Sequence, residues 1–454
     1  MEIVQQIYKA YDVRGVYPTE INEEVAYRTG RAFAELIKSE NKDKNLTVAV
    51  GQDMRTSSPS LFANIVRGIT DQGVNVVDIG LVSTPTFYFG VSFYGYDAGL
   101  QVSASHNPGK YNGFKMTRAG AVPVSGDTGI MIVRDMVVAN NFPEVKDKGS
   151  VSKREGVLED QIKFALGYAE TSKIKPFKVV IDSANGMGGP LMEELFKYLS
   201  CELVKLYFEL DGNFPNHEAD PLKDENNKDL HAKVLEVGAD LGVALDGDAD
   251  RIFFVDNKGK TVEPAIMRGI LAKIFLQDNP GSKICYDIRP GKITIDMIEQ
   301  YGGEPVVTRV GHSLIKEKMR EVDSIFSGES SGHFFLKMPH GSFEVPEIML
   351  LKVLQELSQS NQTMSEYIAP LQKYFHSGEI NFAVEDKEAV FARLKEKYSA
   401  NLQYDFDGLS FMFSDFWFNV RASNTENKVR LNLESVSAEL TKEKVEEVSR
   451  LITS

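Results

Sequence analysis

The chain has 454 residues, of which 42% are hydrophobic and 26% charged, a composition that excludes disordered, collagen-like and coiled-coil proteins. This length predicts roughly three domains. No apolar run approaches the roughly 20 residues of a membrane helix, and the first residues lack the basic and apolar parts of a signal peptide. We therefore expect a cytoplasmic protein without a membrane partner.

Acidic residues outnumber basic ones by 65 to 51, which gives a formal net charge of -14. This charge repels nucleic-acid backbones and anionic membranes, and no basic run offsets it. We expect no nucleic-acid partner, and a small phosphate would need a few convergent arginines. The two cysteines, Cys201 and Cys285, lie in apolar contexts without Cys-x-x-Cys spacing, which predicts buried, reduced thiols.

One arrangement of elements recurs three times at irregular spacing. A strand ending in Asp leads through a helix to a second strand, and a later third strand opens into a polar, glycine-containing loop that an aromatic strand follows. The first strands are expected at 48–53, 179–182 and 284–287, and the second strands at 73–78, 203–210 and 305–308. The polar loops are expected at 103–108, 246–251 and 328–333. The aromatic strands are expected at 113–116, 252–255 and 333–336.

This plan predicts an α/β fold with three similar mixed α/β domains, active-site loops at strand carboxyl ends, and a C-terminal α+β domain, around a central cleft. In the last domain we expect helices at 387–398 and 440–451 and strands at 379–384, 411–413, 417–420 and 429–433. The expected domain bounds are 1–150, 151–256, 257–368 and 369–454.

The loop Asp246-Gly247-Asp248-Ala249-Asp250-Arg251 places three carboxylates at alternate positions, with small residues between them. Such carboxylates can converge on one hard cation, for which Mg²⁺ is the natural occupant. A calcium-binding EF-hand would need Gly at its sixth position and Glu at its twelfth, where this chain has Arg251 and Asn257. An acidic turn remains the alternative, because Asp-Gly favours turns.

Two further loops contain serines that could act as nucleophiles. Ser105 stands in a Pro-bounded turn beside His106, which suits a nucleophile at an exposed tip, although these are also ordinary turn residues. Ser330 lies at the centre of a Gly-x-Ser-x-Gly match. That hydrolase motif requires a helix directly after the serine, whereas a strand is expected here. Lys115, taken alone, is expected to be a solvent-exposed charge.

Near the C-terminus, Arg421 opens the sequence Arg-Ala-Ser-Asn-Thr-Glu, and Arg430 follows on the next strand. Two guanidinium groups with neutral hydrogen-bond donors suit a dianionic phosphate, with a polar turn as the alternative. In the N-terminal segment, Arg14 is either a further phosphate ligand or half of a structural salt bridge.

Together and in this order, the Ser105 loop, the three-aspartate loop, the Gly-Glu-Ser-Ser-Gly-His sequence at 328–333 and the Arg-x-Ser-Asn-Thr-Glu sequence at 421–426 resemble the α-D-phosphohexomutase family. The resemblance covers nearly the whole chain. The opening at 9–15 and the ending at 429–434 are similar to its phosphomannomutase/phosphoglucomutase branch, whereas phosphoglucosamine mutases begin differently.

The resemblance implies an isomerase that interconverts hexose 1-phosphate and hexose 6-phosphate, of mannose and/or glucose. It implies a phosphoserine at Ser105 and a hexose 1,6-bisphosphate that serves as intermediate and activator. The family's Mg²⁺ ligands map to Ser105, Asp246, Asp248 and Asp250. Its substrate contacts map to Glu329, Ser331, Arg421, Ser423, Asn424, Thr425 and Arg430. Its reacting centre maps to Arg14, Lys115, Arg251, His312 and His333, among which Lys115 and the histidines are candidates for moving a proton.

By the same resemblance, the four domains carry the phosphoserine loop, the metal loop, the sugar-recognition loop and a phosphate site, in a monomer or small homo-oligomer. Ala422 and Asn427 stand where the family usually has proline, which predicts a less rigid phosphate loop. The alternatives are a phosphoglucosamine mutase, a serine hydrolase using Ser330, and a non-catalytic sugar-phosphate sensor. A mere sensor would not need the three aspartates.

Overall fold

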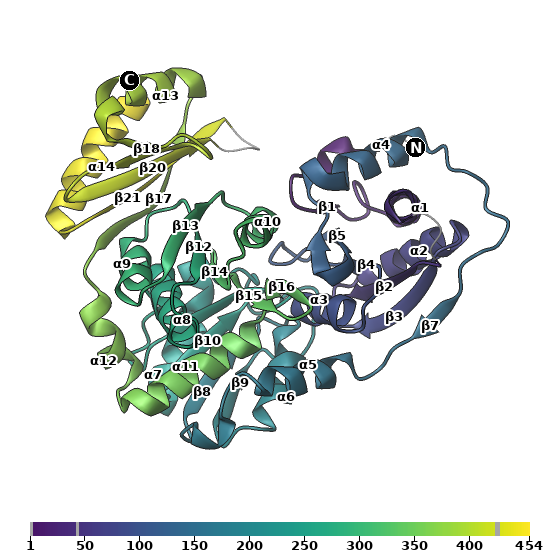
Figure 1. The fold of residues 1–454 in the computed structure, drawn as a ribbon, viewed down its shortest axis with the longest axis horizontal. Helices are drawn as coiled ribbons and strands as arrows, with labels where there is room; N and C mark the ends of the chain where they lie inside the picture. The colour runs from purple at the N-terminus through teal and green to yellow at the C-terminus, as the bar shows by residue number, and fades with distance from the viewer. Residues whose placement is uncertain (1–2, 42–44, 423–426) are drawn as a thin grey trace. The chain divides into compact units, whose positions relative to one another are not determined.

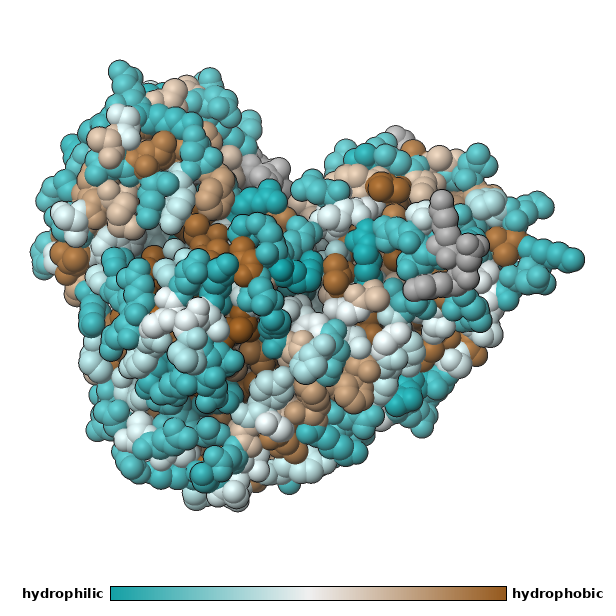
Figure 2. Space-filling view, viewed as in Figure 1, coloured by the Kyte–Doolittle hydropathy of each residue, from teal (hydrophilic) through white to brown (hydrophobic). Residues whose placement is uncertain are grey.

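The structure, a computed structural model, describes residues 3–41, 45–422 and 427–454. The chain groups into two compact units. The first unit comprises Met1–Val262, His312–Glu321 and Ser331–Tyr367, and the second comprises Glu263–Gly311, Val322–Ser330 and Ile368–Ser454. Within the described ranges no helix is long and apolar enough to cross a membrane, and hydrophilic residues cover much of the surface seen in Figure 2.

The first sheet has the strand order β1-β5-β4-β2-β3-β7, with β6 paired to β5 (Figure 1). Its centre is parallel, since β2 lies between β3 and β4, whereas β5 runs antiparallel to both β4 and β1. The strands are β1 (Val13–Val16), β2 (Thr47–Gln52), β3 (Asn75–Leu81), β4 (Ala98–Val102), β5 (Tyr111–Arg118), β6 (Val122–Pro123) and β7 (Val151–Lys153).

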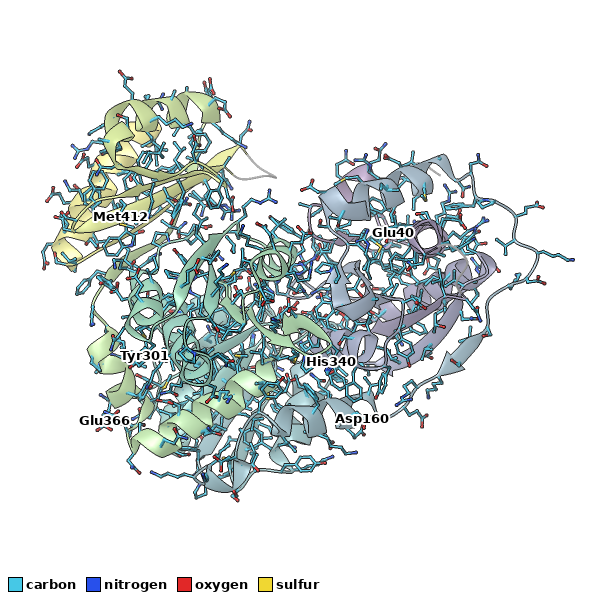
Figure 3. All side chains as sticks on the ribbon, in the orientation of Figure 1. Glu40, Asp160, Tyr301, His340, Glu366 and Met412 are labelled. Atoms are coloured by element: carbon cyan, nitrogen blue, oxygen red, sulfur yellow. The ribbon has the colours of Figure 1, made fainter. Side chains whose placement is uncertain are left out.

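Four helices accompany this sheet: α1 (Glu23–Glu40), α2 (Ser58–Asp71), α3 (Thr84–Phe93) and α4 (Met131–Ala139). The apolar faces of α1 and α2 share one buried core with β2 and β4, which is why these segments fold as amphipathic helices. Glu40, labelled in Figure 3 at the end of α1, accepts hydrogen bonds from Arg118 of β5 through both carboxylate oxygens. The helix is thereby tied to the strand that follows the serine loop.

The second sheet repeats the plan with the order β11-β10-β8-β9. Strands β8 (Lys178–Asp182), β9 (Glu202–Leu206) and β10 (Leu241–Leu245) are parallel, and β11 (Ile252–Val255) is antiparallel to β10. The accompanying helices are α5 (Val157–Leu166), α6 (Gly188–Phe196) and α7 (Lys228–Val237). Strand β9 is shorter than the strand predicted at 203–210, because Tyr207 adopts the left-handed conformation with φ +55° and ends the pairing.

In the second unit, β12 (Lys283–Asp287) runs parallel to both β13 (Glu304–Thr308) and β14 (Phe326–Gly328). Helices α8 (Pro264–Asp278) and α9 (Lys292–Gln300) belong to this unit. The first unit holds the antiparallel hairpin of β15 (Phe334–Met338) and β16 (Gly341–Glu344), with α11 (Pro346–Ser360) and most of α10 (His312–Val322) and α12 (Met364–Ile368).

The C-terminal sheet is entirely antiparallel, with the order β17-β21-β20-β19-β18. Helices α13 (Lys387–Tyr398) and α14 (Ala438–Thr453) share one core with it (Figure 1). The strands are β17 (Phe375–Ala383), β18 (Leu402–Tyr404), β19 (Leu409–Met412), β20 (Phe416–Ala422) and β21 (Lys428–Ser435). Mixed sheets followed by this antiparallel sheet confirm the predicted fold class.

The two cysteines are both free thiols, as predicted. Cys285 is buried in β12. The prediction of burial was wrong for Cys201, which is half-buried, because it stands in the turn before β9 and its thiol donates to the carbonyl oxygen of Lys175 at 3.4 Å.

Candidate active site

The acidic loop joins the buried antiparallel strands β10 and β11. Asp246, Asp248 and Asp250 are at most 2% exposed, and one carboxylate oxygen from each lies within 4.8 Å of the others. The close packing of this loop on the serine loop requires glycine at position 247, because a Cβ there would lie only 2.6 Å from the carbonyl oxygen of Ser105. The three carboxylates therefore converge, as the sequence predicted.

Ser105 follows β4 and directs its hydroxyl at this cluster. Its Oγ donates to Oδ2 of Asp246 at 2.9 Å, and its φ of +51° is unusual for a residue other than glycine. The expectation of an exposed tip was wrong, because Ser105 is only 1% exposed. Its hydroxyl bonds to Asp246 and its carbonyl oxygen accepts from Arg55 Nη2 at 2.7 Å, so both groups face inward.

Lys115, on β5, is the cation closest to the carboxylates. Its Nζ lies 2.8 Å from Asp248 Oδ2 and 2.6 Å from Asp250 Oδ2, and the residue is 3% exposed, so it is not a solvated charge. Burial opposes its charge, but Asp248 and Asp250 raise the pKa of Lys115 well above its ordinary value. Burial and the two neighbouring carboxylates raise the pKa of Asp246 well above the usual range for aspartate. The cluster therefore carries more negative charge than its lysine balances.

The donor set fits a hard divalent cation. Carboxylate oxygens are the ligands that Mg²⁺ prefers. Oδ1 of Asp248 is buried and has no hydrogen-bond partner in the described part of the chain, while Oδ2 accepts from Lys115 and from Thr84 Oγ1. An unpartnered carboxylate oxygen in a buried acidic cluster is costly unless a cation lies beside it. Asp246, Asp248 and Asp250 could therefore hold a metal ion.

Two histidines of the first unit lie beside this cluster. Nε2 of His333 is 3.1 Å from Asp250 Oδ1, and its Nδ1 is 3.1 Å from Ser331 Oγ. The ring of His312 lies 6.0 Å from that of His333, and both of its ring nitrogens are buried without a hydrogen-bond partner among the described residues. Burial holds the pKa of His312 well below its ordinary value, so its imidazole is neutral.

Two arginines complete the first unit's site. Arg14 donates from Nη1 to Asn107 Oδ1 and from Nε to Asp12 Oδ2, both at 2.8 Å, so it forms a structural salt bridge and also contacts the serine loop. Burial opposes its charge, but Asp12 and the acidic loop raise the pKa of Arg14 above its ordinary value. Arg251 donates from its backbone N–H to Asp246 Oδ1 at 3.2 Å, and its Nε lies 3.8 Å from Asp246 Oδ2.

The Gly-x-Ser-x-Gly segment is not a nucleophile elbow. Ser330 donates from Oγ to Asp287 Oδ1 at 2.8 Å and accepts from Arg268 Nη1 at 3.0 Å, and the chain continues into strand β15 instead of a helix. This arrangement contradicts the hydrolase alternative. Glu329 accepts from the backbone N–H of Gly311 at 3.0 Å, so the loop is bonded to Gly311 as well as to Asp287 and Arg268.

The two C-terminal arginines face each other on neighbouring strands. Arg421 of β20 and Arg430 of β21 are direct partners in the antiparallel register. Asp407 accepts from Arg421 Nε at 3.0 Å, Glu379 lies 3.4 Å from Arg430 Nη1, and Arg430 Nε is buried without a hydrogen-bond partner in the described chain. Three predicted phosphate ligands lie outside the described residues: Ser423, Asn424 and Thr425.

Sequence reasoning missed several residues that shape the site. Thr84, at the start of α3, donates from its hydroxyl to Asp248 Oδ2 at 2.6 Å and from its backbone N–H to the Asp248 carbonyl oxygen at 3.0 Å. Lys316 and Glu344 form a completely buried ion pair, and a Glu344 oxygen lies within 4.8 Å of ligand atoms of Asp250 and His333. No local motif marks these residues, because their partners are far away in the sequence.

The fold and the site define a multidomain α/β protein whose buried serine lies against a carboxylate cluster able to hold a metal. Four family models match the chain in order: the phosphoglucomutase/phosphomannomutase alpha/beta/alpha domains I, II and III at residues 5–139, 159–259 and 264–374, and the C-terminal domain at 379–451. The chain belongs to the phosphoglucomutase/phosphomannomutase family, which confirms the resemblance. The exact bounds that we expected for the domains remain predictions.

Full-length relatives agree with this assignment. A phosphomannomutase from Vibrio cholerae is 39% identical over 455 residues, which cover 98% of each chain. A phosphomannomutase from Escherichia coli K12 is 39% identical over 437 residues, 94% of each chain. A crystal structure of a phosphoglucomutase/phosphomannomutase family protein from Burkholderia thailandensis has a TM-score of 0.90 and 32% identity, and covers 99% of this chain and 97% of its own.

Proposed function

We propose that this protein is a phosphohexomutase that interconverts hexose 1-phosphates and hexose 6-phosphates of mannose and/or glucose. The observation that carries the proposal is the Ser105 hydroxyl, 2.9 Å from Asp246 Oδ2, inside a buried cluster of three carboxylates beside Lys115. This arrangement suits a serine that stores a phosphoryl group. Family membership and the phosphomannomutases among its relatives support the same reaction.

In the proposed reaction the phosphoserine transfers its phosphoryl group to the free hydroxyl of a hexose monophosphate. The bond between phosphorus and Ser105 Oγ breaks and a bond to the sugar oxygen forms. The sugar hydroxyl proton passes to a base, and the departing Ser105 Oγ takes up a proton from an acid. Lys115, Arg14 and Arg251 neutralise charge on the moving group, which is the main catalytic requirement of phosphoryl transfer. His312 and His333 are the candidates to accept the proton. Lys115, whose pKa Asp248 and Asp250 raise well above its ordinary value against the effect of burial, is charged and is a candidate only to donate one.

The resulting hexose 1,6-bisphosphate then returns its other phosphoryl group to Ser105, so the sugar must turn over between the two transfers. The same bisphosphate can phosphorylate a dephosphorylated enzyme and thus activate it. We place Mg²⁺ on Asp246, Asp248 and Asp250 with a phosphoserine oxygen, where it would stabilise the negative charge that develops during transfer.

Sugar hydroxyls are assigned to Glu329 and Ser331, and the phosphate that does not react is assigned to the C-terminal group. In that group, Arg421 and Arg430 face each other, and although Asp407 and Glu379 pair with them, Arg430 Nε has no hydrogen-bond partner among the described residues and is available to an oxygen of a dianionic phosphate. The complete proposed phosphate set is Arg421, Ser423, Asn424, Thr425 and Arg430.

The decisive test is Ser105→Ala, with Ser92→Ala as the matched control, because Ser92 is also buried but its hydroxyl donates to the Phe89 carbonyl oxygen within α3. With Mg²⁺ and a trace of hexose 1,6-bisphosphate, we expect the first variant to lose at least about 10³-fold in kcat and the control to stay near wild type. Intact-mass analysis should find phosphate on the wild type and none on Ser105→Ala. A fully active Ser105→Ala enzyme would refute the proposal.

The sugar is settled by comparing glucose, mannose and glucosamine 1-phosphates as substrates. Similar turnover of the first two supports the dual-specificity branch, whereas preference for the third would make the protein a phosphoglucosamine mutase. Binding of all three without turnover would favour the sensor.

A further inference from the structure

The backbone of the serine loop adopts a conformation that it cannot hold unaided. Ser105 has a φ of +51°, in the left-handed region that residues other than glycine rarely adopt. Between Ser105 and Tyr111, where β5 begins, the chain makes few hydrogen bonds of its own, through Asn107 N–H to Ala104 and Tyr111 N–H to Pro108. Carbonyl groups of this loop therefore point away from it and need donors elsewhere.

The Tyr17 backbone N–H donates to the Lys110 carbonyl oxygen at 2.9 Å, and one side chain supplies four further donors. Arg55, in the connection between β2 and α2, donates from Nη2 to the carbonyl oxygens of Ser105 at 2.7 Å and Asn107 at 2.6 Å. Its Nη1 donates to the carbonyl oxygens of Pro108 and Tyr111, both at 3.0 Å. The fifth N–H, on Nε, donates to Asp53 at 3.2 Å. Every donor of the guanidinium group is used, and four of the five bind the serine loop.

The surroundings of Arg55 fit this single side chain. Its side chain is completely buried, as is that of Asp53, which also accepts from Ser58 Oγ at 2.6 Å. The ring of Phe214 lies 5.1 Å from the guanidinium carbon. A Cβ on Gly212 would come within 2.5 Å of the Arg55 Cα, so the loop that packs on Arg55 requires glycine there. Arg55 is therefore bonded to Asp53 and packed by Phe214 and the loop at Gly212, in addition to its bonds to the serine loop.

We propose that Arg55 is a positioning residue for phosphoryl transfer, which fixes the backbone of residues 105–111 so that Ser105 Oγ stays aimed at the acidic cluster. This inference rests on the proposed function. Arg55 touches no reacting atom, because its contacts end at the carbonyl oxygens of the loop. Its role is to hold the phosphoryl group in line with the acceptor and out of reach of water, the competing acceptor.

Lysine cannot replace this arginine. An ammonium group places three donors on one nitrogen, whereas the four carbonyl oxygens require a planar fork that spans them. Arg55→Lys keeps the buried positive charge beside Asp53 but leaves carbonyl groups of the loop without donors. A displacement of about 1 Å at a reacting atom can lower the rate by about 10²-fold.

The test compares Arg55→Lys with Arg31→Lys in the full-length enzyme. Arg31 is the matched control, because its guanidinium also hydrogen-bonds and stacks within the first domain, on Gln72 and Phe142, but contacts nothing in the serine loop. We expect Arg55→Lys to lower kcat by about 10²-fold and to change the KM for the sugar phosphate by less than about threefold. We also expect enzyme labelled with ³²P on Ser105 to release inorganic phosphate to water at least tenfold faster.

A purely structural role would lower the melting temperature without changing kcat of the folded enzyme or the rate of phosphate release, and that result overturns the proposal. If Arg55→Lys does not fold, Asp53→Asn decides, since it keeps the shape of the pocket and all four bonds from Arg55 to the serine loop, and it weakens the anchor of Nε together with the bonds that Asp53 accepts from Ser58 Oγ and the Arg55 backbone N–H. Faster phosphate release with an unchanged KM then supports the proposal, and wild-type values overturn it. A wild-type enzyme that takes no phosphate on Ser105 would instead refute the proposed function.

Discussion

Removing one member of the buried ion pair between Lys316 and Glu344 should destabilise the first unit strongly. Nζ of Lys316 donates to both oxygens of Glu344, at 3.0 and 3.1 Å, and both side chains are 0% exposed. The ammonium also lies 4.1 Å from the ring centroid of Tyr88. Lys316→Met fills similar space but leaves the carboxylate buried with no cation on it.

The size of the effect follows from the distance. At 3.0 Å and an effective dielectric constant of about 20, the attraction is about 5.5 kcal/mol. Part of it is offset by the cost of burying both charges, and burial indeed lowers the pKa of Lys316 despite Glu344. Breaking such a pair from one side usually costs about 3–5 kcal/mol, because the remaining charge keeps its desolvation penalty. We expect a loss in that range from Lys316→Met.

The assay is urea unfolding of three variants at neutral pH. Lys316→Met paired with Glu344→Leu removes both charges and should recover most of the lost stability. Lys318→Met is the control, because Lys318 lies on the same helix and its pair with Glu321 is exposed, which limits its effect to about 1 kcal/mol. A loss from Lys316→Met no larger than that of the control would show that the buried pair does not hold the unit together.

Two further perturbations test other parts of the first unit. Gly247→Ala should abolish most activity and lower the melting temperature, because the new Cβ would lie 2.6 Å from the Ser105 carbonyl oxygen; wild-type kcat would contradict this packing. His217 donates from Nε2 to Asp182 and from Nδ1 to the carbonyl oxygen of Glu218. Burial opposes the charge of this imidazole, but Asp182 raises the pKa of His217 above its ordinary 6.5. This stabilisation is complete below about pH 6.5 and is lost as pH rises through the raised pKa, so the wild-type melting temperature should fall relative to that of His217→Asn over that range.

Local patterns determined how much of the fold could be predicted. The helix at 387–398 and the aromatic strand at 252–255 appear with the expected bounds, because each is set by its own periodicity and end signals. The strand at 203–210 was too long, since the left-handed turn at Tyr207 is a tertiary feature. The alternation of strands and helices likewise predicts α/β units, but it does not predict how tertiary contacts group these units into the two compact parts of the chain.

The acidic loop could be recognised because its three ligands lie within five residues of one another, so one stretch of sequence holds the whole cluster. Arg55 and Thr84 could not be recognised, because they act on atoms 50 and 164 residues away. The burial of Ser105 was missed for the same reason. A turn composition shows that a loop exists, whereas the partners of its backbone carbonyl groups depend on the tertiary fold.

For the proposed function, the charge balance around Ser105 links Mg²⁺ binding to phosphate binding. The side chains of Arg14, Lys115 and Arg251 already form ion pairs with carboxylates, so they offer little net attraction for a phosphate. The locally positive site that a phosphate needs therefore requires a divalent cation on the acidic loop first. Chelation should accordingly weaken binding of hexose 1,6-bisphosphate, and not only slow turnover, in isothermal titration calorimetry. Asp248→Asn removes one negative charge from this loop, so the affinity of this variant for hexose 1,6-bisphosphate should depend less on Mg²⁺ than that of the wild type. The same dependence on Mg²⁺ in both proteins would contradict this explanation.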